Sequence, residues 1–322
     1  MKRFLVLGIV VAVVVLGWTA GWFYVSGEIR NTVAALAQNE DPAQPTLACG
    51  GLSITGFPFR FDIACTGATV TSGDLVARTE ELRVSALVYR PTHLQAFARS
   101  PLTLDDAFTG ARSQVDWTGL EASLRLEDWR IARTSVVARD VAWTDTLAGG
   151  LPIAGATAIA AHLVDVPAQY DTAAGTATLA AYADIDGLTS PGLAIAAGDG
   201  IVEAQITRVP ADVRSWGEGD LLRRWQANGG AIVLSEARGS DEPDFVTANG
   251  EVKLDDSGRP EGQIALSSRG LAERLSMVIP EGMRPLILGQ QAPDGTYSQT
   301  ITMQSGVVMS GVMPTALLTP LW

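Results

Sequence analysis

Residues 57–65 read FPFRFDIAC, and the spacing of their apolar side chains indicates the fold class of the chain. Every second residue of this segment is a phenylalanine, an isoleucine or a cysteine, so one side of it is apolar. A period of two predicts a β-strand, because successive side chains of a strand point to opposite faces of a sheet. The same alternation occurs in LRVSALV at 82–88 and in LEASLRL at 120–126.

Strand-like runs continue through the rest of the chain, separated by turn sequences such as Asn249-Gly250 and Asp256-Ser257-Gly258. Short strands joined by such turns favour antiparallel pairing over β-α-β units. We therefore predict a mainly β protein, with a large antiparallel sheet domain and a few short helices. The further strand runs are 201–207, 231–237, 245–254, 262–267 and 298–303, with small-residue strands in 154–183; the expected helices are 219–227, 270–278 and 105–112.

The N-terminus carries an apolar run, Phe4–Val25, that follows the cations Lys2 and Arg3. As a helix this run spans about 30 Å, which is the thickness of the hydrocarbon core of a bilayer. Four aromatic residues lie near its far end, where amphipathic rings prefer the membrane interface. The run predicts one transmembrane helix, and the two cations place its N-terminus in the cytoplasm. The four aromatic residues are Trp18, Trp22, Phe23 and Tyr24.

A cleaved signal peptide is the alternative interpretation of this run. Signal peptides have shorter apolar cores and a small-residue cleavage site of the A-x-A type. In this chain Trp18 lies three residues before any cut after Ala20, so we predict an anchor that is not cleaved. Residues 46–50, TLACG, resemble a lipoprotein cysteine motif only superficially, since Thr46 stands where leucine is required and the apolar run is far away.

Three segments follow from these observations: a membrane anchor at 1–25, a helix and linker at 26–48, and a β-rich periplasmic domain at 49–322. Ser26 to Gln38 has helical spacing of Ile29, Val33 and Leu36 and either continues the anchor or packs on the domain. The predicted location is the inner membrane, single-pass, with the bulk of the chain in the periplasm.

Cys49 and Cys65 are the two cysteines of the chain. The predicted periplasmic location is oxidising, so we expect them to form a structural disulfide. A redox-active pair is the other interpretation, but the sequence contains no C-x-x-C motif. Leu52 and Ile54 are at even positions and Cys49 is at an odd one, so a regular strand would place them on opposite faces. We expect a β-bulge at Gly50-Gly51 that brings them to the same face.

Four segments together resemble a bacterial envelope family, the domain of unknown function numbered twenty-one twenty-five. These segments are CGGLSITGFPFRF at 49–61 with Cys65, VYRPTHL at 88–94, LDDSGRPEG at 254–262 and GVVMSGVMP at 306–314. The resemblance extends over essentially the whole chain and implies no activity; the tail at 315–322 is more apolar than the family pattern. More distantly, the layout is similar to AsmA-like envelope proteins, which implies a curved periplasmic β-sheet with an apolar groove for lipid tails.

The sequence offers no catalytic constellation and no metal-binding motif. His93 and His162 are the only histidines, they are far apart, and nucleophile-elbow, phosphate-loop and H-E-x-x-H motifs are absent. We therefore predict a protein that is not an enzyme and needs no cofactor. The formal charge of −12, from 35 acidic and 23 basic residues, also argues against nucleic acid as a partner.

The alternating segments allow two interpretations of the apolar faces. Each face packs into an ordinary core, or some faces stay open as a groove that holds lipid. The second interpretation predicts a protein that binds or shuttles lipid for envelope maintenance; the alternative is a scaffold that binds an envelope protein. The lipid-facing candidates are Phe57, Phe59, Phe61, Ile63, Leu82, Val84 and Val88.

Overall fold

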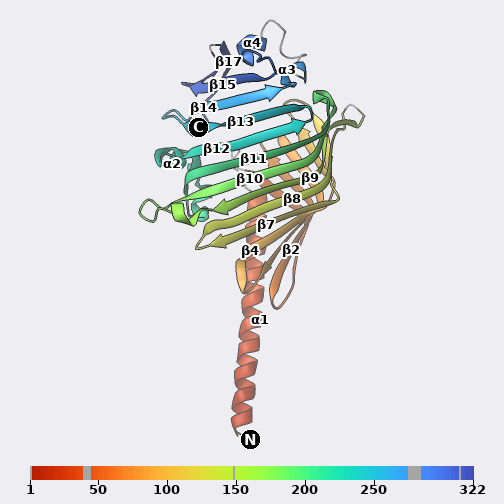
Figure 1. Ribbon diagram of the computed structural model, residues 1–322. Coiled ribbons are helices and arrows are strands. Elements are labelled where there is room, and N and C mark those ends of the chain that lie inside the picture. Colours follow the sequence, from red (N-terminus) through yellow and green to blue (C-terminus); the bar gives the residue numbers. More distant parts are fainter. Residues whose placement is uncertain (1, 39–44, 148, 275–283, 312) are drawn as a thin grey trace. The chain divides into compact units, whose positions relative to one another are not determined.

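The computed structural model describes residues 2–38, 45–147, 149–274, 284–311 and 313–322 (Figure 1). It contains one long N-terminal helix, a few short helices and an antiparallel sheet of 17 strands. The predicted fold class is therefore confirmed. The chain forms two compact units: the first is Met1–Ser123 with Trp143–Leu151, and the second is Leu124–Ala142 with Pro152–Trp322.

The first unit is built from the N-terminal helix α1 (Lys2–Ala37) and six antiparallel strands. The strands are β1 (Thr46–Thr55), β2 (Arg60–Ser72), β3 (Leu75–Leu87), β4 (Arg90–Ala98), β5 (Leu102–Asp106) and β6 (Arg112–Asp116). Strands β7 (Gly119–Glu127), β8 (Arg130–Asp145) and β9 (Leu151–Asp165) carry residues of both units.

The second unit contains the remaining strands, and β10 and β11 bend along their length (Figure 1). Its strands are β10 (Thr176–Ser190), β11 (Ile195–Pro210), β12 (Ala231–Asp241), β13 (Asp244–Leu254), β14 (Pro260–Arg269), β15 (Tyr297–Gln304), β16 (Val307–Ser310) and β17 (Met313–Leu317). Its helices are η1 (Pro167–Gln169), η2 (Pro191–Leu193), η3 (Val213–Glu218), α2 (Leu221–Ala227), α3 (Leu271–Arg274) and α4 (Arg284–Ile287).

The apolar N-terminal run and the segment from Ser26 onward form one uninterrupted helix, α1. Every residue from Arg3 to Trp18 is exposed, and the residues that pack against the unit follow further along. These residues recur with alternating spacings of three and four, so they lie on one face of the helix. They are Thr19, Trp22, Ser26, Ile29 and Val33.

Residues 57–59 are a turn, so the predicted strand at 57–65 is wrong over its first three residues. Gly56 has φ +99°, and a Cβ there would lie 2.8 Å from the backbone oxygen of Arg60. The amide of Arg60 donates to the carbonyl of Gly56 at 3.1 Å, which closes the turn. Pro58 lacks an N–H and cannot continue a strand ladder at this position.

The predicted helices have mixed outcomes. The segment 219–227 contains α2, which ends at Ala227 and has Asn228 as its C-cap. The segment 270–278 contains α3, and its residues from 275 onward lie outside the described part of the chain. The segment 105–112 is not a helix: it forms the end of β5, a turn and the start of β6, because Asp106 accepts from the amides of Phe108 and Thr109 in the turn. The small-residue segment 154–183 forms β9 and β10, as expected.

The two cysteines form the expected disulfide between β1 and β2. The register of these strands is unbroken from Thr46 to Thr55, so the predicted bulge at Gly50-Gly51 is absent. The buried positions of β2 change parity instead at Gly67, which has φ +58° and lies against Gly50.

Loss of the disulfide is expected to lower the free energy of unfolding by about 3 kcal/mol, because the bond closes a loop with a sequence separation of 16. Denaturant unfolding of the detergent-solubilised chain, with and without dithiothreitol, measures this difference. The Cys49→Ser/Cys65→Ser variant should match the reduced wild type and should not respond to dithiothreitol. Ready maleimide labelling of both cysteines in unreduced native protein would contradict the prediction.

Candidate functional site

An aromatic cluster joins α1 to the turn between β1 and β2 in the first unit. The rings of Trp22 and Phe61 are stacked, with centroids 5.3 Å apart, and both side chains are buried. Phe57 meets the edge of Trp22 at 5.6 Å and stacks on Phe23 at 6.1 Å. Two indole N–H groups complete the contact: Trp18 donates to the carbonyl of Pro58 at 3.0 Å, and Trp22 donates to that of Arg60 at 3.1 Å.

In the first unit, strand register places apolar side chains side by side on one face of the sheet. We call this surface the first apolar face. Ile63 of β2 lies between Ile54 and Val84, and Cys65 lies between Leu52 and Leu82. Strand β4 extends both rows with Ala96 and Ala98. Since paired residues of adjacent strands point to the same side, these residues form a continuous surface.

The second unit carries a longer apolar row, which we call the apolar stripe. Seven residues from seven strands are paired in succession, and each of them is half-buried. The stripe consists of Leu163, Ala181, Ala204, Leu234, Gly250, Ile264 and Ile301. The neighbouring row, one residue along each strand and on the opposite face, includes Gln205, Glu251, Gln263 and Thr302.

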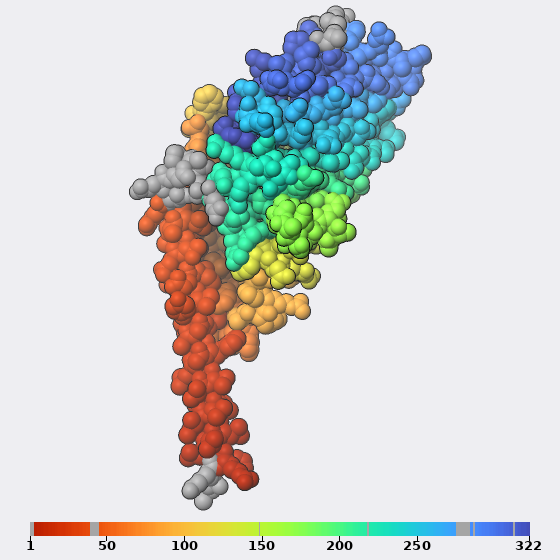
Figure 2. Space-filling view, turned by 90° about the vertical axis from the view of Figure 1, so that its left-hand side faces the viewer, coloured from red at the N-terminus to blue at the C-terminus, as the bar shows by residue number. Residues whose placement is uncertain are grey.

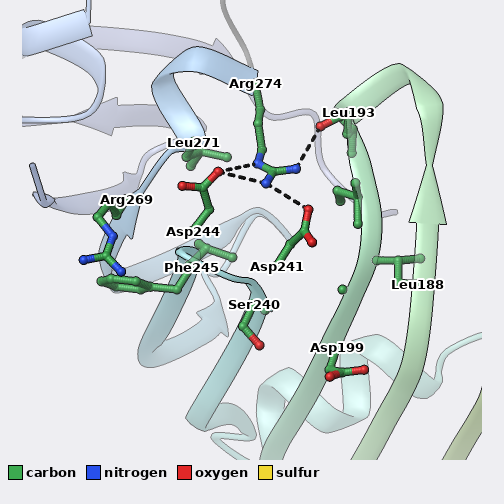
Figure 3. Close-up of a pocket in the computed structure, with 14 residues that line it drawn as sticks. Leu188, Leu193, Asp199, Ser240, Asp241, Asp244, Phe245, Arg269, Leu271 and Arg274 are labelled. Carbon is green, nitrogen blue, oxygen red and sulfur yellow. Dashed lines mark hydrogen bonds and ion pairs between the residues drawn. The ribbon is translucent and has the colours of Figure 1, made fainter.

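A cavity of about 240 Å³ opens at the ends of the strands in the second unit (Figure 3). Its lining comes from the β10–η2–β11 connection, the turn between β12 and β13, and α3. Val246 lines the cavity and shares a face of β13 with Ala248 and Gly250, which are two and four residues further along the strand. The apolar lining residues are Leu188, Leu193, Ile195, Phe245, Val246 and Leu271.

Arg274 holds one wall of this cavity in place, as Figure 3 shows. Its guanidinium contacts the carboxylates of Asp241 at 2.9 Å and Asp244 at 2.8 Å, and donates to the carbonyl of Ala194 at 2.7 Å. Burial by itself would lower the pKa of Arg274, but the hydrogen bonds with Asp244 and Asp241 outweigh it and raise the pKa above its ordinary value. Arg274 is therefore a permanent cation whose donors are used within the protein.

The charges at the cavity do not favour an anionic headgroup. Two arginines, Arg269 and Arg274, line it together with three aspartates, Asp199, Asp241 and Asp244, so the formal charge is 2 − 3 = −1. The guanidinium of Arg269 lies over the ring of Phe245, 5.3 Å from its centroid. The arrangement suits an uncharged, apolar group.

The described residues offer no cluster of side chains for a metal ion. No group of three histidine, cysteine, aspartate or glutamate side chains could hold a metal within the described ranges. His93 lies in β4 of the first unit, whereas His162 lies in β9 of the second. His162 is bonded through Nδ1 to the hydroxyl of Ser135 at 2.9 Å and stacks on Tyr182, which fits a structural role.

A family model described as "uncharacterized protein conserved in bacteria" (DUF2125) matches residues 22–318. The chain belongs to this family. The match begins in α1 at Trp22 and includes all the strands from β1 to β17. Comparison with curated proteins found no match.

In this DUF2125 protein the predicted lipid-facing residues separate into two groups. Phe61, Ile63, Leu82 and Val84 lie on the face of β2 and β3 described above, where Phe61 is covered by Trp22. Phe57, Phe59 and Val88 lie in turns at the ends of strands instead. Contact of either group with lipid remains a prediction.

Sequence reasoning missed the apolar stripe and the cavity. The strand-like runs at 201–207 and 231–237 predicted two of the seven strands of the stripe, β11 and β12. They could not show that Ala204 lies opposite Leu234, because a β-bulge shifts the register between Glu203 and Ala204. The cavity residues come from segments up to 86 positions apart, between Leu188 and Arg274, and no local pattern unites them.

Replacement of Arg274 by glutamine is expected to lower the free energy of unfolding by about 2 kcal/mol, because it leaves Asp241 and Asp244 facing one another without a cation. The Arg274 side chain is only 17% exposed, so solvent screens this contact weakly. Denaturant unfolding measures the loss. The control is Arg125→Gln, whose ion pair with Glu127 is 61% exposed on the arginine side and should contribute less than about 1 kcal/mol. Equal effects of the two substitutions would contradict the prediction.

Proposed function

We propose that this protein is a single-pass inner-membrane protein whose periplasmic sheet binds the acyl chains of lipids. The observation that carries the proposal is the apolar stripe of the second unit. Its seven members come from seven strands, and none of them is fully buried. A sheet face of this kind is normally covered by a core or by a ligand.

The dimensions of the stripe suit an acyl chain. Seven adjacent strands span six spacings of about 4.8 Å, so the stripe is about 29 Å long. Each methylene that leaves water contributes about 0.8 kcal/mol, so ten methylenes on the stripe would contribute about 8 kcal/mol before ordering costs. The neutral stripe offers no partner to a headgroup, which would remain in solvent.

The cavity beside Arg274 gives the bound chain a place to end. Val246 belongs to the cavity lining and to the same face of β13 as Gly250 of the stripe. The apolar surface therefore continues along β13 from the stripe to the cavity. A volume of about 240 Å³ is close to the lower end of the range for small-molecule sites and would hold the end of a chain rather than a whole lipid.

The contacts of α1 support an anchor that stays attached to the domain. The helix is long and apolar enough to cross a membrane. Trp18 is hydrogen-bonded to the turn at Pro58, and Trp22 is buried against Phe61. Removal of a signal peptide after Ala20 would separate Trp18 from its partner in the folded domain. An apolar groove for lipid tails is also what the more distant resemblance to AsmA-like proteins implies.

The mature protein is expected to retain Met1–Ala20 and to expose its C-terminus to the periplasm, because Lys2 and Arg3 hold the N-terminus on the cytoplasmic side. Intact mass measurement of purified protein checks the first statement. Alkaline phosphatase fused after Trp322 should be active, and the same fusion with cytoplasmic β-galactosidase should be inactive. A mature chain that began near Gly21, or an inactive phosphatase fusion, would contradict this topology.

We expect lipid to co-purify with the wild-type chain when a non-lipid detergent is used for purification. The Ala181→Asp variant should carry at least tenfold less of this bound lipid. The substitution places a carboxylate at the second position of the stripe, between Leu163 and Ala204, where desolvation of the charge opposes acyl binding. Mass spectrometry of the extracted lipids measures the difference.

The matched control is Ala180→Asp, which makes the same change one residue earlier, on the opposite face of β10 beside Gln205. It should keep the wild-type amount of lipid, and circular dichroism should show both variants folded. Equal lipid content in the two variants would overturn the proposal. A wild-type protein without lipid would also overturn it and would favour the alternative, a scaffold that binds another envelope protein.

A further inference from the structure

The turn between β1 and β2 lies where α1 leaves the strands of the first unit. Trp18 is the first residue of α1 bonded to this turn, and the residues of the helix before it, from Arg3 onward, are exposed among the described residues of the unit (Figure 2). A second turn, between β3 and β4, lies beside the first, since the amide of Val88 donates to the carbonyl of Phe59 at 2.9 Å. These two turns, Gly56–Phe59 and Val88–Tyr89, form what we call the aromatic foot.

The free part of α1 is too short to cross a bilayer without help. The apolar residues before the first contact are Phe4 to Gly17, which is 14 residues. At 1.5 Å per residue they span about 21 Å, whereas the hydrocarbon core is about 30 Å thick. The membrane must therefore thin, or about 9 Å of the hydrocarbon layer must surround the part of the protein that follows, namely Trp18 to Tyr24 and the aromatic foot.

The side chains of the aromatic foot are of the type that enters a membrane interface. Phe57 is 48% exposed, Phe59 is 64% exposed and Tyr89 is 69% exposed. Together with Phe23 and Tyr24 of α1, they place aromatic rings around the helix where it meets the domain. Aromatic residues concentrate at this level of membrane proteins because the ring is apolar and tolerates the headgroup region.

The backbone of the foot is prepared for an apolar environment. A backbone carbonyl that lacks a hydrogen-bond donor is costly in lipid. Four carbonyls in and beside the first turn avoid this cost because they accept hydrogen bonds from donors of the protein. Gly56 accepts from Arg60, Pro58 from Trp18, Phe59 from Val88, and Arg60 from Trp22. Pro58 has no N–H that would need a partner. A turn that faced only water would not require indole donors for its carbonyls.

Cations lie at the border of the foot. Arg60 begins β2 directly after the first turn, and Arg90 begins β4 directly after the second; both side chains are exposed. They flank Leu87 of β3, with which each is paired from its own side of that strand, and Arg60 also contacts Asp62 through Nε at 2.5 Å. Arginine at this level can reach lipid phosphates while the rings beside it sit deeper.

We propose that the aromatic foot inserts into the membrane leaflet that faces the domain and is a second membrane contact besides α1. Phe57, Phe59 and Tyr89 enter the interface, Arg60 and Arg90 meet phosphates, and the first unit is held against the bilayer surface. This inference depends on α1 as a membrane helix and not on lipid binding by the apolar stripe.

The test uses the full chain, with its disulfide intact, in vesicles of phosphatidylethanolamine and phosphatidylglycerol at 3:1. Phe59→Cys is labelled with an environment-sensitive nitrobenzoxadiazole, and lipids spin-labelled at an upper acyl position serve as quencher. The matched control is Phe108→Cys, because Phe108 is also an exposed phenylalanine, 85% exposed, in the β5–β6 turn of the same unit. The expected result is at least threefold stronger quenching by lipid at position 59 than at 108, with the reverse order for aqueous iodide.

Equal lipid quenching at the two positions, or full iodide access at position 59, would overturn the inference. Because a label at position 59 replaces one ring of the foot, the same measurement is repeated with Tyr89→Cys, which leaves Phe57 and Phe59 in place. Lipid quenching at position 89 should also exceed that at 108. Loss of co-purified lipid in Ala181→Asp would leave these results unchanged, so failure of the foot and failure of the acyl-binding stripe are distinguishable.

Discussion

Trp22 stacks on Phe61 with ring centroids 5.3 Å apart, and both side chains are buried in the first unit. This contact ties a helix of membrane composition to the first long strand of the sheet. Because Trp22 also donates its indole N–H to the carbonyl of Arg60, the helix is fixed in direction as well as in position. The position of the hydrophobic span relative to the strands of the first unit follows from this contact, and the hydrogen bond from Trp18 to the carbonyl of Pro58 sets the end of the free helix before it.

Antiparallel register determines the alignment of the apolar stripe, on which the proposed function depends. A pairing that shifted by one residue would move every side chain of a strand to the other face. In the second unit one irregularity of β12, between Leu234 and Ala237, shifts the register with both of its neighbouring strands, β11 and β13, and Leu234 remains paired with Ala204 and Gly250. The stripe is therefore a product of pairing. Its apolar character is shared by seven strands, although alanine and glycine contribute three of its seven members.

The charged side chain of Arg274 in the second unit has a structural role and is not available to a ligand. Arg274 is bonded to two carboxylates and to backbone carbonyls, so its charge stabilises the junction of η2, α3 and the β12–β13 turn. It has no donor directed at a ligand phosphate. Under the proposed function, the apolar cavity beside it and the apolar stripe would take only the hydrocarbon part of a lipid.

The sequence by itself determined the N-terminal helix, the mainly β fold, the antiparallel pairing, the disulfide partners and the family, because each depends on local periodicity, on composition or on a short motif. The strand at 57–65 was right from Arg60 onward, since alternation is local, and wrong at 57–59, where a closed turn overrides it. The tertiary structure decided which apolar rows align, where a cavity forms, and that Phe57 and Phe59 stand beside α1 rather than on a sheet face. These features depend on register and on contacts between distant segments, such as Trp18 with Pro58 and Arg274 with Ala194, and a period along one strand carries no information about its partner across the sheet.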